Sequence, residues 1–207
     1  MRWASVIIIG TLLLGGACKV KEPPPIAERW ADDFDRAELG GDYYNSGGEY
    51  EIVDGSLRAE KSYNHPLWLR KRLPRDVQIE FDAWAETAIG DIKVELYGDG
   101  RSSAGDKGAY TSTGYVAVFG GWSNTKSILA RGNEHGGQLS QDQTRRKVIP
   151  GQKYHWKLVR KGSLVEWFLD DALFLSYDDP APRESGYFAF ANWEAATRFD
   201  NLVVTPL

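Results

Sequence analysis

Residues 77–86 read VQIEFDAWAE, and their side chains alternate between an apolar set (Val77, Ile79, Phe81, Ala83, Ala85) and a second set that is polar apart from Trp84. A period of two residues is typical of a β-strand that buries one face and exposes the other. Residues 91–97 (DIKVELY) repeat the pattern after a short turn. The two segments therefore predict neighbouring strands of one sheet.

The same short-period pattern continues in both directions from this pair. Residues 49–53 and 56–60 flank Asp54-Gly55, a strong hairpin signal. Further strand-like segments follow, separated by clusters of Gly, Pro, Asn and Asp, and no stretch of a dozen residues has an amphipathic helical pattern. Many short strands with regular turns predict an all-β, antiparallel sandwich or barrel. Two longer loops, residues 98–113 and 132–144, are candidates for functional segments.

The N-terminus predicts export. An apolar run at residues 6–14 follows Arg2 and is too short for a bilayer-spanning helix, which needs about 20 residues. It matches the hydrophobic region of a signal peptide, and Gly15-Gly16-Ala17 precede Cys18, the single cysteine of the chain. This arrangement resembles the lipobox of bacterial lipoproteins, in which the signal is cut before a cysteine that is then lipidated. An ordinary secretory signal followed by a chance cysteine is the alternative.

The lipobox resemblance implies a division of the chain into a signal peptide (1–17), a lipidated Cys18 with a Pro-rich tether (18–27), and one domain (28–207). It also implies a lipid-anchored protein of the bacterial cell envelope, periplasmic or surface-facing. The outer membrane is favoured, because Lys19 stands where an Asp would signal retention in the inner membrane.

Composition excludes several classes of function. The chain has 207 residues, of which 42% are hydrophobic and 26% charged, so the sequence predicts a folded domain. A net charge of −4 without a long basic cluster argues against nucleic acid as a partner. The three histidines have no spacing that suggests a shared metal, and no phosphate loop, dinucleotide fingerprint or nucleophile elbow occurs in the sequence.

The polar face of residues 77–86 is the first candidate site. If the two strands pair antiparallel with Glu86 opposite Asp91, acids and aromatic rings gather on one surface. Carboxylates accept hydrogen bonds from sugar hydroxyls, and flat rings stack on the apolar face of a pyranose. A solvated strand face is the alternative. The expected cross-strand pairs are Trp84 with Lys93, Asp82 with Glu95, and Glu80 with Tyr97.

Strand ends supply the second set of candidates. Aromatic side chains on such rims often stack ligands, although a Trp that caps the core is equally expected. Arg131 could bind a uronate or pair with an acid. The candidates of this set are Trp122, Asn124, Arg131, Asn192 and Trp193.

Several short strings occur together in an order that resembles the concanavalin A-like lectin/glucanase superfamily, especially bacterial exported domains of the 3-keto-disaccharide hydrolase type and their relatives. They are Phe34-Asp35, Asp54-Gly55-Ser56-Leu57, Gly120-Gly121-Trp122-Ser123-Asn124, Trp167-Phe168-Leu169-Asp170 and Phe199-Asp200-Asn201-Leu202. The resemblance implies a jelly roll of two curved antiparallel sheets that binds ligands across its concave sheet. In some members of the superfamily, acids at the junction of the two chain ends hold a structural Ca²⁺, so the resemblance allows one near Asp35 and Asp200; a turn with a hydrogen-bonding pair is the alternative. No other cofactor is expected.

The superfamily includes lectins, glycan-binding modules, glucanases and lyases, so the fold does not decide the function. Two motifs depart from its enzymes. The third acid, Glu86, is one place later than in the glucanase motif, and the Asn-Ser-Gly-Ile-x-x-Arg string of the keto-disaccharide hydrolase branch is missing.

The leading hypothesis is a lipid-anchored protein that binds a poly- or oligosaccharide. One alternative is a glycoside-cleaving enzyme with Glu80, Asp82 or Glu95 as acid and base. The other is an envelope interaction module without a sugar site.

Overall fold

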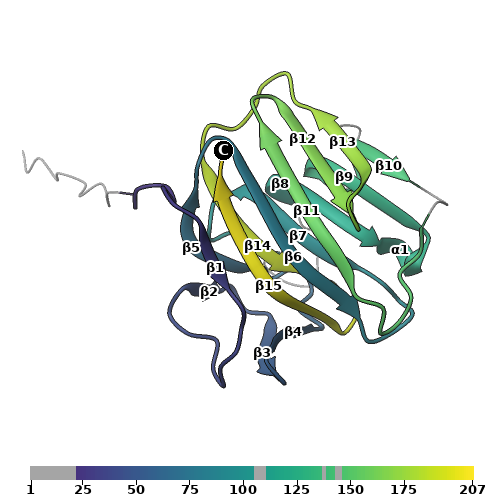
Figure 1. Cartoon of the computed structure of the whole chain (residues 1–207). Helices are drawn as coiled ribbons and strands as arrows, with labels where there is room; N and C mark the ends of the chain where they lie inside the picture. Colours follow the sequence, from purple (N-terminus) through teal and green to yellow (C-terminus); the bar gives the residue numbers. More distant parts are fainter. Residues whose placement is uncertain (1–21, 105–110, 137–138, 143–145) are drawn as a thin grey trace, which may run out of the picture.

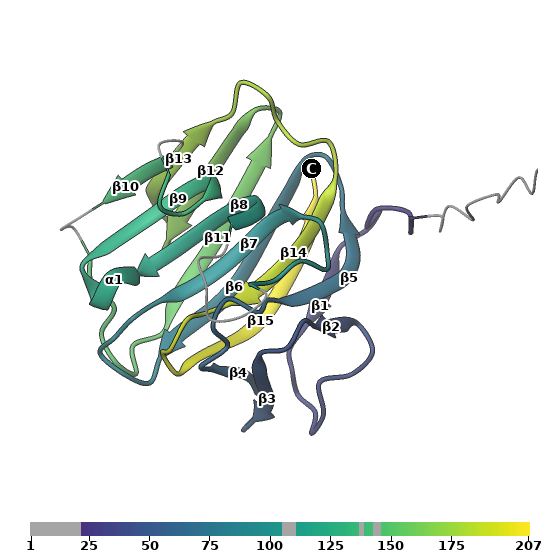
Figure 2. The ribbon, with the colours of Figure 1, turned by 180° about the vertical axis from the view of Figure 1, so that it is seen from behind.

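Two antiparallel β-sheets pack face to face in the computed structural model, which describes residues 22–104, 111–136, 139–142 and 146–207 (Figures 1 and 2). The predicted jelly-roll sandwich is confirmed. The eight-stranded sheet has the order β13-β12-β11-β6-β15-β4-β3, with β1 also paired to β15, and the seven-stranded sheet has the order β10-β9-β8-β7-β14-β5-β2.

The strands of the eight-stranded sheet are β1 (Trp30–Asp32), β3 (Glu49–Val53), β4 (Ser56–Glu60), β6 (Val77–Ala85), β11 (Tyr154–Lys161), β12 (Leu164–Leu169), β13 (Ala172–Asp178) and β15 (Thr197–Pro206). Those of the seven-stranded sheet are β2 (Tyr43–Asn45), β5 (Leu67–Leu73), β7 (Ile92–Gly98), β8 (Thr111–Gly120), β9 (Lys126–Asn133), β10 (Leu139–Asp142) and β14 (Gly186–Ala191). A single short turn, α1 (Gly121–Asn124), joins β8 to β9.

The core lies between the sheets and is rich in aromatic rings. The apolar side of β6 is fully buried, as its alternation predicts. Phe81 stacks on Trp156 with ring centroids 5.3 Å apart, and Trp156 stacks on Trp167 at 4.3 Å. Each large apolar side chain buried in this way contributes about 1.5–3 kcal/mol to folding.

The predicted pairing of β6 with β7 is wrong. β6 lies between β11 and β15, whereas β7 lies between β8 and β14 in the other sheet. Residues 86–91 therefore cross from one sheet to the other instead of forming a hairpin. Glu86 N–H donates to the carbonyl of Ala196 (2.8 Å), and the crossing ends at Gly90 and Asp91, both at positive φ (79° and 63°). The expected two-strand patch of acids and aromatics does not form.

The N-terminal part of the described chain lies against the sandwich. Pro25 forms a parallel bridge with Arg72, Ile26 N–H donates to the Arg72 carbonyl (2.9 Å), and Ile26 packs on the core. The C-terminal half of the expected tether thus contacts β5. The expected signal peptide and Cys18 lie outside the described residues. Within the described ranges, no helix has the length and apolar character needed to span a bilayer.

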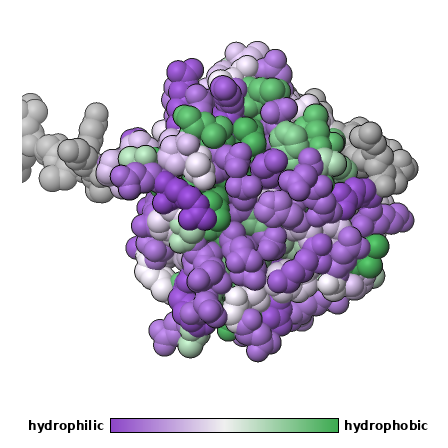
Figure 3. Space-filling view, viewed as in Figure 1, coloured by the Kyte–Doolittle hydropathy of each residue, from purple (hydrophilic) through white to green (hydrophobic). Residues whose placement is uncertain are grey.

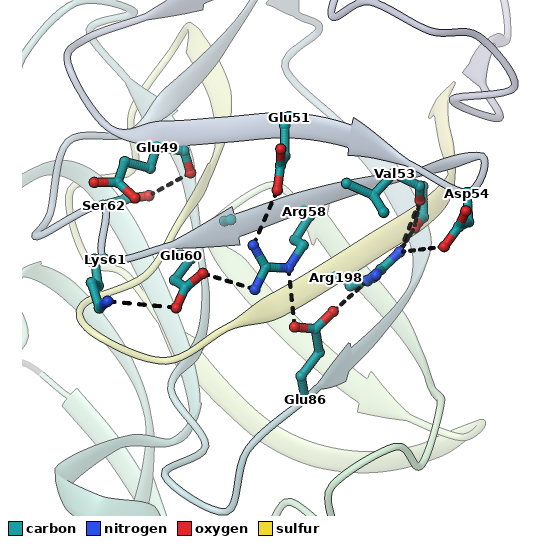
Figure 4. Close-up of polar contacts among 12 residues, drawn as sticks. Glu49, Glu51, Val53, Asp54, Arg58, Glu60, Lys61, Ser62, Glu86 and Arg198 are labelled. Carbon is teal, nitrogen blue, oxygen red and sulfur yellow. Dashed lines mark hydrogen bonds and ion pairs between the residues drawn. The ribbon is translucent and has the colours of Figure 1, made fainter.

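The outer face of the eight-stranded sheet is mostly hydrophilic (Figure 3). Near β3 and β4 it carries a network of ion pairs in which Glu86 joins two arginines, accepting from Arg58 Nε (3.0 Å) and Arg198 Nε (2.6 Å) (Figure 4). Burial acts against ionisation of Glu86, but Arg198 and Arg58 outweigh it and lower its pKa. Glu86 is therefore a cross-strand clamp between β6, β15 and β4.

Candidate functional site

The face of the seven-stranded sheet that points away from the core is partly covered by loops. On β7, Lys93 and Glu95 point to this face, yet they are only 3% and 1% exposed. One cover is the described part of the predicted long loop: Trp68 Nε1–H donates to the Ser102 carbonyl (3.1 Å), and the Ala104 N–H donates to the Asn64 carbonyl (3.0 Å). The face stays open toward α1.

A cavity of about 490 Å³ lies at that open end. Two indoles stand beside a polar floor, and the lining comes from β7, β8 and α1 and from the loops after β4, β6, β9 and β14. The lining residues are Asn64, Ile89, Asp91, Lys93, Val118, Trp122, Ser123, Glu134, His135, Trp193 and Glu194.

Lys93 is the centre of the polar floor. Its Nζ donates to Asn64 Oδ1 (2.9 Å) and lies 3.0 Å from Glu134 Oε2 and 3.9 Å from Asp91 Oδ1. Burial disfavours the ammonium, but Asp91 and Glu134 outweigh that cost and raise the pKa of Lys93. The lysine is therefore charged at neutral pH, and it holds together Asp91, just before β7, and two side chains from other loops, Asn64 and Glu134.

Asp91 fixes the position of Trp193. Its Oδ2 accepts a hydrogen bond from Trp193 N–H (2.6 Å), while the backbone carbonyl of Trp193 accepts from Tyr63 N–H (3.1 Å). The Tyr63 ring meets the Trp193 indole edge-on at 5.1 Å. Burial, aided by Glu134, raises the pKa of Asp91 against the opposing effect of Lys93. Asp91 is thus both a positioning group and a carboxyl that holds its proton more readily than an exposed one.

Trp122 stands on the opposite rim, in a backbone of unusual conformation. Trp122, Ser123 and Asn124 have φ of 52°, 57° and 59°, a left-handed turn that costs free energy for residues with side chains. A close approach of two glycines anchors it: a Cβ on Gly90 would lie 2.3 Å from the Gly120 carbonyl oxygen. The strain presents Trp122 to solvent, with 36% of its surface exposed.

The surroundings of the Trp122 ring are polar. The Lys126 ammonium lies 4.0 Å from its centroid, and the His135 ring meets it edge-on at 5.4 Å. His135 Nε2 is 3.5 Å from Glu134 Oε1, which links this rim to the floor. The cavity therefore combines flat apolar rings with donors and acceptors held in place, an arrangement suited to a polyhydroxylated ligand.

The structure brings three of the sequence candidates together here: Lys93, Trp122 and Trp193. The sequence reasoning missed Asn64, Asp91, Glu134, His135 and Glu194 as site residues. A signal existed for two of them, because Glu134-His135 lies in a loop singled out by its length.

Three candidates lie on the outer face of the other sheet. Asp82 Oδ1 is 3.0 Å from His155 Nδ1 and its Oδ2 accepts from Asn201 Nδ2 (3.0 Å), while Glu80 Oε1 is 3.7 Å from His155 Nε2. The Lys153 ammonium covers the Trp84 ring at 4.3 Å. These residues form a solvated strand face and do not meet Lys93 or Glu95.

The remaining candidates have structural partners. Glu95 Oε1 accepts from the backbone N–H groups of Thr113 (2.8 Å) and Gly114 (2.9 Å), which holds the irregular start of β8. Tyr97 belongs to the core, and its hydroxyl lies 2.8 Å from the carbonyl oxygens of both Pro74 and Arg75, which share its one proton. Arg131 Nε pairs with Asp179 Oδ2 at 2.8 Å, so the acid it meets is a residue of its own chain.

The two asparagines support the rim from behind. Asn124 bonds both backbone groups of Val148, donating to its carbonyl (2.7 Å) and accepting from its N–H (2.9 Å). Asn192 is fully buried, accepts from Ser62 N–H (3.0 Å) and donates to the Ala59 carbonyl (3.0 Å). Both residues position the loops of the cavity from behind it.

The structural Ca²⁺ near Asp35 and Asp200 stays a prediction. Within the described ranges, no three His, Cys, Asp or Glu side chains gather in a way that could hold a metal. Asp200 Oδ2 lies 3.6 Å from Lys153 Nζ. Asp35 packs against the β3–β4 turn, where its Oδ1 would lie 3.2 Å from a Cβ on Gly55.

One family profile matches part of the chain. Residues 102–202 match a family profile described as "Domain of unknown function (DUF6250)". A comparison with curated protein sequences found no significant match.

Solved structures share the architecture at low identity. The carbohydrate-binding module CBM66 from Bacillus subtilis has a TM-score of 0.62 and 16% identity, covering 81% of this chain and 98% of its own. A β-glucanase from Bacillus licheniformis has a TM-score of 0.60 and 12% identity, covering 87% and 99%. A laminarinase from a Flavobacterium species has a TM-score of 0.55 and 13% identity, covering 85% and 98%. The likeness shows the jelly-roll fold that binding modules and glycoside hydrolases share.

Proposed function

We propose that this protein binds a glycan in the cavity between Trp122 and Trp193. The observation that carries the proposal is the pair of indoles on opposite rims of a polar floor centred on Lys93. The indoles can stack on a sugar ring, and the floor offers acceptors to its hydroxyls. Similar folds in a carbohydrate-binding module and in glucan-cleaving enzymes support a saccharide ligand.

A glycan array probed with residues 22–207, followed by titration calorimetry on the glycans that bind, tests this function. We expect binding to at least one saccharide, weakened about tenfold by Trp122→Ala, since a lost aromatic stacking contact of about 1.4 kcal/mol corresponds to that factor. Trp84→Ala, on the opposite sheet, is the matched control. Absence of binding across a broad array would contradict the proposal.

Cleavage of a glycosidic bond is a second candidate function, and the raised pKa of Asp91 favours it. A carboxyl that holds its proton can protonate a leaving oxygen, and Glu134 would supply a second carboxylate in the same cavity. Mass analysis of glycans incubated with the protein tests this reaction. Products that disappear in Asp91→Asn and in Glu134→Gln would establish the enzyme, whereas intact glycans would leave a binding protein.

Export and lipid anchoring complete the proposal. Cys18 follows an apolar run and three small residues and has no second cysteine in the chain to pair with. Expression of the full chain in a bacterium, with membrane fractionation and labelled fatty acid, tests the anchor. We expect label on the wild-type protein in the membrane fraction, and a soluble, unlabelled protein for Cys18→Ser. Equal labelling of both would refute lipidation at Cys18.

A further inference from the structure

The charges around the cavity are unbalanced. Three acidic residues line it, Asp91, Glu134 and Glu194, against a single lysine, Lys93. The ammonium of Lys93 is already engaged by Asn64 at 2.9 Å and by Glu134 at 3.0 Å, and its side chain is only 4% exposed. A ligand therefore meets more negative charge than positive charge on entering.

Two of the acids have capacity to receive a ligand. Glu194 is exposed at the mouth of the cavity, close enough to Asp91 to raise the pKa of that carboxyl. Glu134 is 7% exposed, and the one described partner of its Oε2 is the Lys93 ammonium at 3.0 Å. A carboxylate oxygen has two lone pairs, so Oε2 can accept a second donor beside Lys93, above all a charged donor.

The aromatic rim also accommodates a cation. The Lys126 ammonium already lies 4.0 Å from the centroid of the Trp122 ring, a position in which the electron-rich indole face attracts positive charge. Lys126 does not line the cavity, and its flexible side chain can move aside at small cost. A ligand ammonium can thus approach both the indole and the carboxylates.

An anionic ligand would find no unengaged cation among the described lining residues, because the ammonium of Lys93 is already held by Asn64 and Glu134. Arg131, the candidate for a uronate, pairs with Asp179 and is not part of the cavity lining. Bringing a carboxylate or sulfate beside Glu134 and Glu194 opposes like charges where burial lowers the effective dielectric constant.

We propose that the cavity selects amino sugars, saccharides that carry a free ammonium group, over their neutral counterparts and rejects uronates and sulfated sugars. This inference rests on the proposed glycan-binding function and names its substrate class. The ammonium would donate to Glu134 Oε2 and Glu194 while the pyranose face stacks on the indoles.

Four sets of oligosaccharides of equal length test the inference by titration calorimetry: glucosamine, N-acetylglucosamine, glucose and glucuronate oligomers. The first two differ at one substituent, a charged ammonium in the first and a neutral acetamide in the second, and the glucose oligomer lacks both groups. We expect the glucosamine oligomer to bind about tenfold more tightly than its N-acetylated partner, the gain expected for one charge-assisted hydrogen bond. The glucuronate oligomer should not bind. The preference should weaken with added salt, because Glu194 lies at the exposed mouth.

Two variants sharpen the test. Glu194→Gln should reduce the preference for the charged sugar without unfolding the protein, because Glu194 is exposed. Glu184→Gln, an exposed acid 3.8 Å from Arg75 and outside the cavity lining, is the matched control and should leave the ratio unchanged.

The outcomes separate the inference from the function it rests on. Equal affinity for charged and N-acetylated oligomers, or tighter binding of glucuronate, would overturn the amino-sugar preference while glycan binding stands. If a neutral glycan binds in the array but glucosamine oligomers do not bind, the amino-sugar preference is overturned as well. If no saccharide binds, the glycan-binding function itself is refuted.

Discussion

Replacing Lys93 by Met removes the one ammonium among the described cavity-lining residues and keeps a side chain of similar length. In the native protein this ammonium lies 3.0 Å from Glu134 Oε2 and 3.9 Å from Asp91 Oδ1, and its side chain is 4% exposed. Removing one partner of a buried ion pair leaves an uncompensated charge and costs about 3–5 kcal/mol. The total stability of a domain is only about 5–15 kcal/mol, so the effect is easily measured.

Urea denaturation of the wild-type protein and of Lys93→Met near neutral pH measures the loss. Lys157→Met is the matched control: Lys157 also lies on a central strand, but it pairs at 3.7 Å with Asp171, which is 85% exposed. An exposed pair of this kind contributes about 0–1 kcal/mol. We expect Lys93→Met to lose at least about 3 kcal/mol and the control to lose less than about 1 kcal/mol.

The loss should also depend on pH. Burial already raises the pKa of Asp91, and without Lys93 that pKa rises further. An acid whose folded pKa lies above its unfolded value destabilises the fold as pH rises through that range, because the folded state holds more protons. The loss of unfolding free energy in Lys93→Met should therefore become smaller as the pH falls toward the ordinary pKa of Asp. A loss below about 1 kcal/mol, or a deficit that grows on acidification, would refute the buried-charge reasoning.

Two further perturbations test the scaffold. Glu86→Gln should cost about 1–2 kcal/mol near neutral pH, the strength of a charge-assisted clamp discounted for partial exposure. The pKa of Glu86 is lowered in the fold, so its contribution to stability is present above the ordinary Glu pKa and is lost as pH falls through the folded pKa. The stabilities of wild type and variant should therefore converge in acid. An equal difference in unfolding free energy at neutral and acidic pH, measured by urea denaturation, would contradict this. Gly114→Ala should lower the free energy of unfolding by about 3 kcal/mol or more, since a Cβ there would lie 2.0 Å from the Leu96 carbonyl oxygen. Gly41→Ala is the control and should be nearly neutral, because a Cβ at Gly41 meets nothing within 4 Å. Thermal denaturation of both variants measures the difference. Equal melting temperatures for the two alanine variants would show that β8 can shift to accept the methyl group.

Much of the fold follows from local sequence patterns. The alternation of residues 77–86 predicts β6 and its buried face, and Asp54-Gly55 predicts the β3–β4 hairpin. Both features depend on neighbours in the chain, which a sequence displays directly. The partner of a strand depends on neighbours in space: β6 pairs with β11 and β15, which lie far along the chain. A short polar turn between two alternating segments looks the same whether it closes a hairpin or crosses between sheets.

The candidate site shows the same division. Trp122 and Trp193 are predictable as rim aromatics because they follow strands at Gly-rich or polar ends. The sequence predicts Lys93 as a site residue through a strand pairing that does not exist. In the structure it belongs to the cavity because Asn64 and Glu134, from two other loops, join Asp91 around its ammonium. Convergence of this kind depends on loop conformations, including the positive φ of Asn64 and Asp91, which sequence patterns do not reveal.

The most direct test of the central claim compares Trp193→Ala with Trp84→Ala in calorimetric titrations of one glycan that the array identifies. Trp193 lines the cavity of the seven-stranded sheet, whereas Trp84 lies on the outer face of the eight-stranded sheet beneath Lys153. The cavity account predicts that Trp193→Ala weakens binding by about tenfold or more and that Trp84→Ala leaves it unchanged. Loss of binding in Trp84→Ala with full affinity in Trp193→Ala would contradict the account and move the site to the opposite sheet.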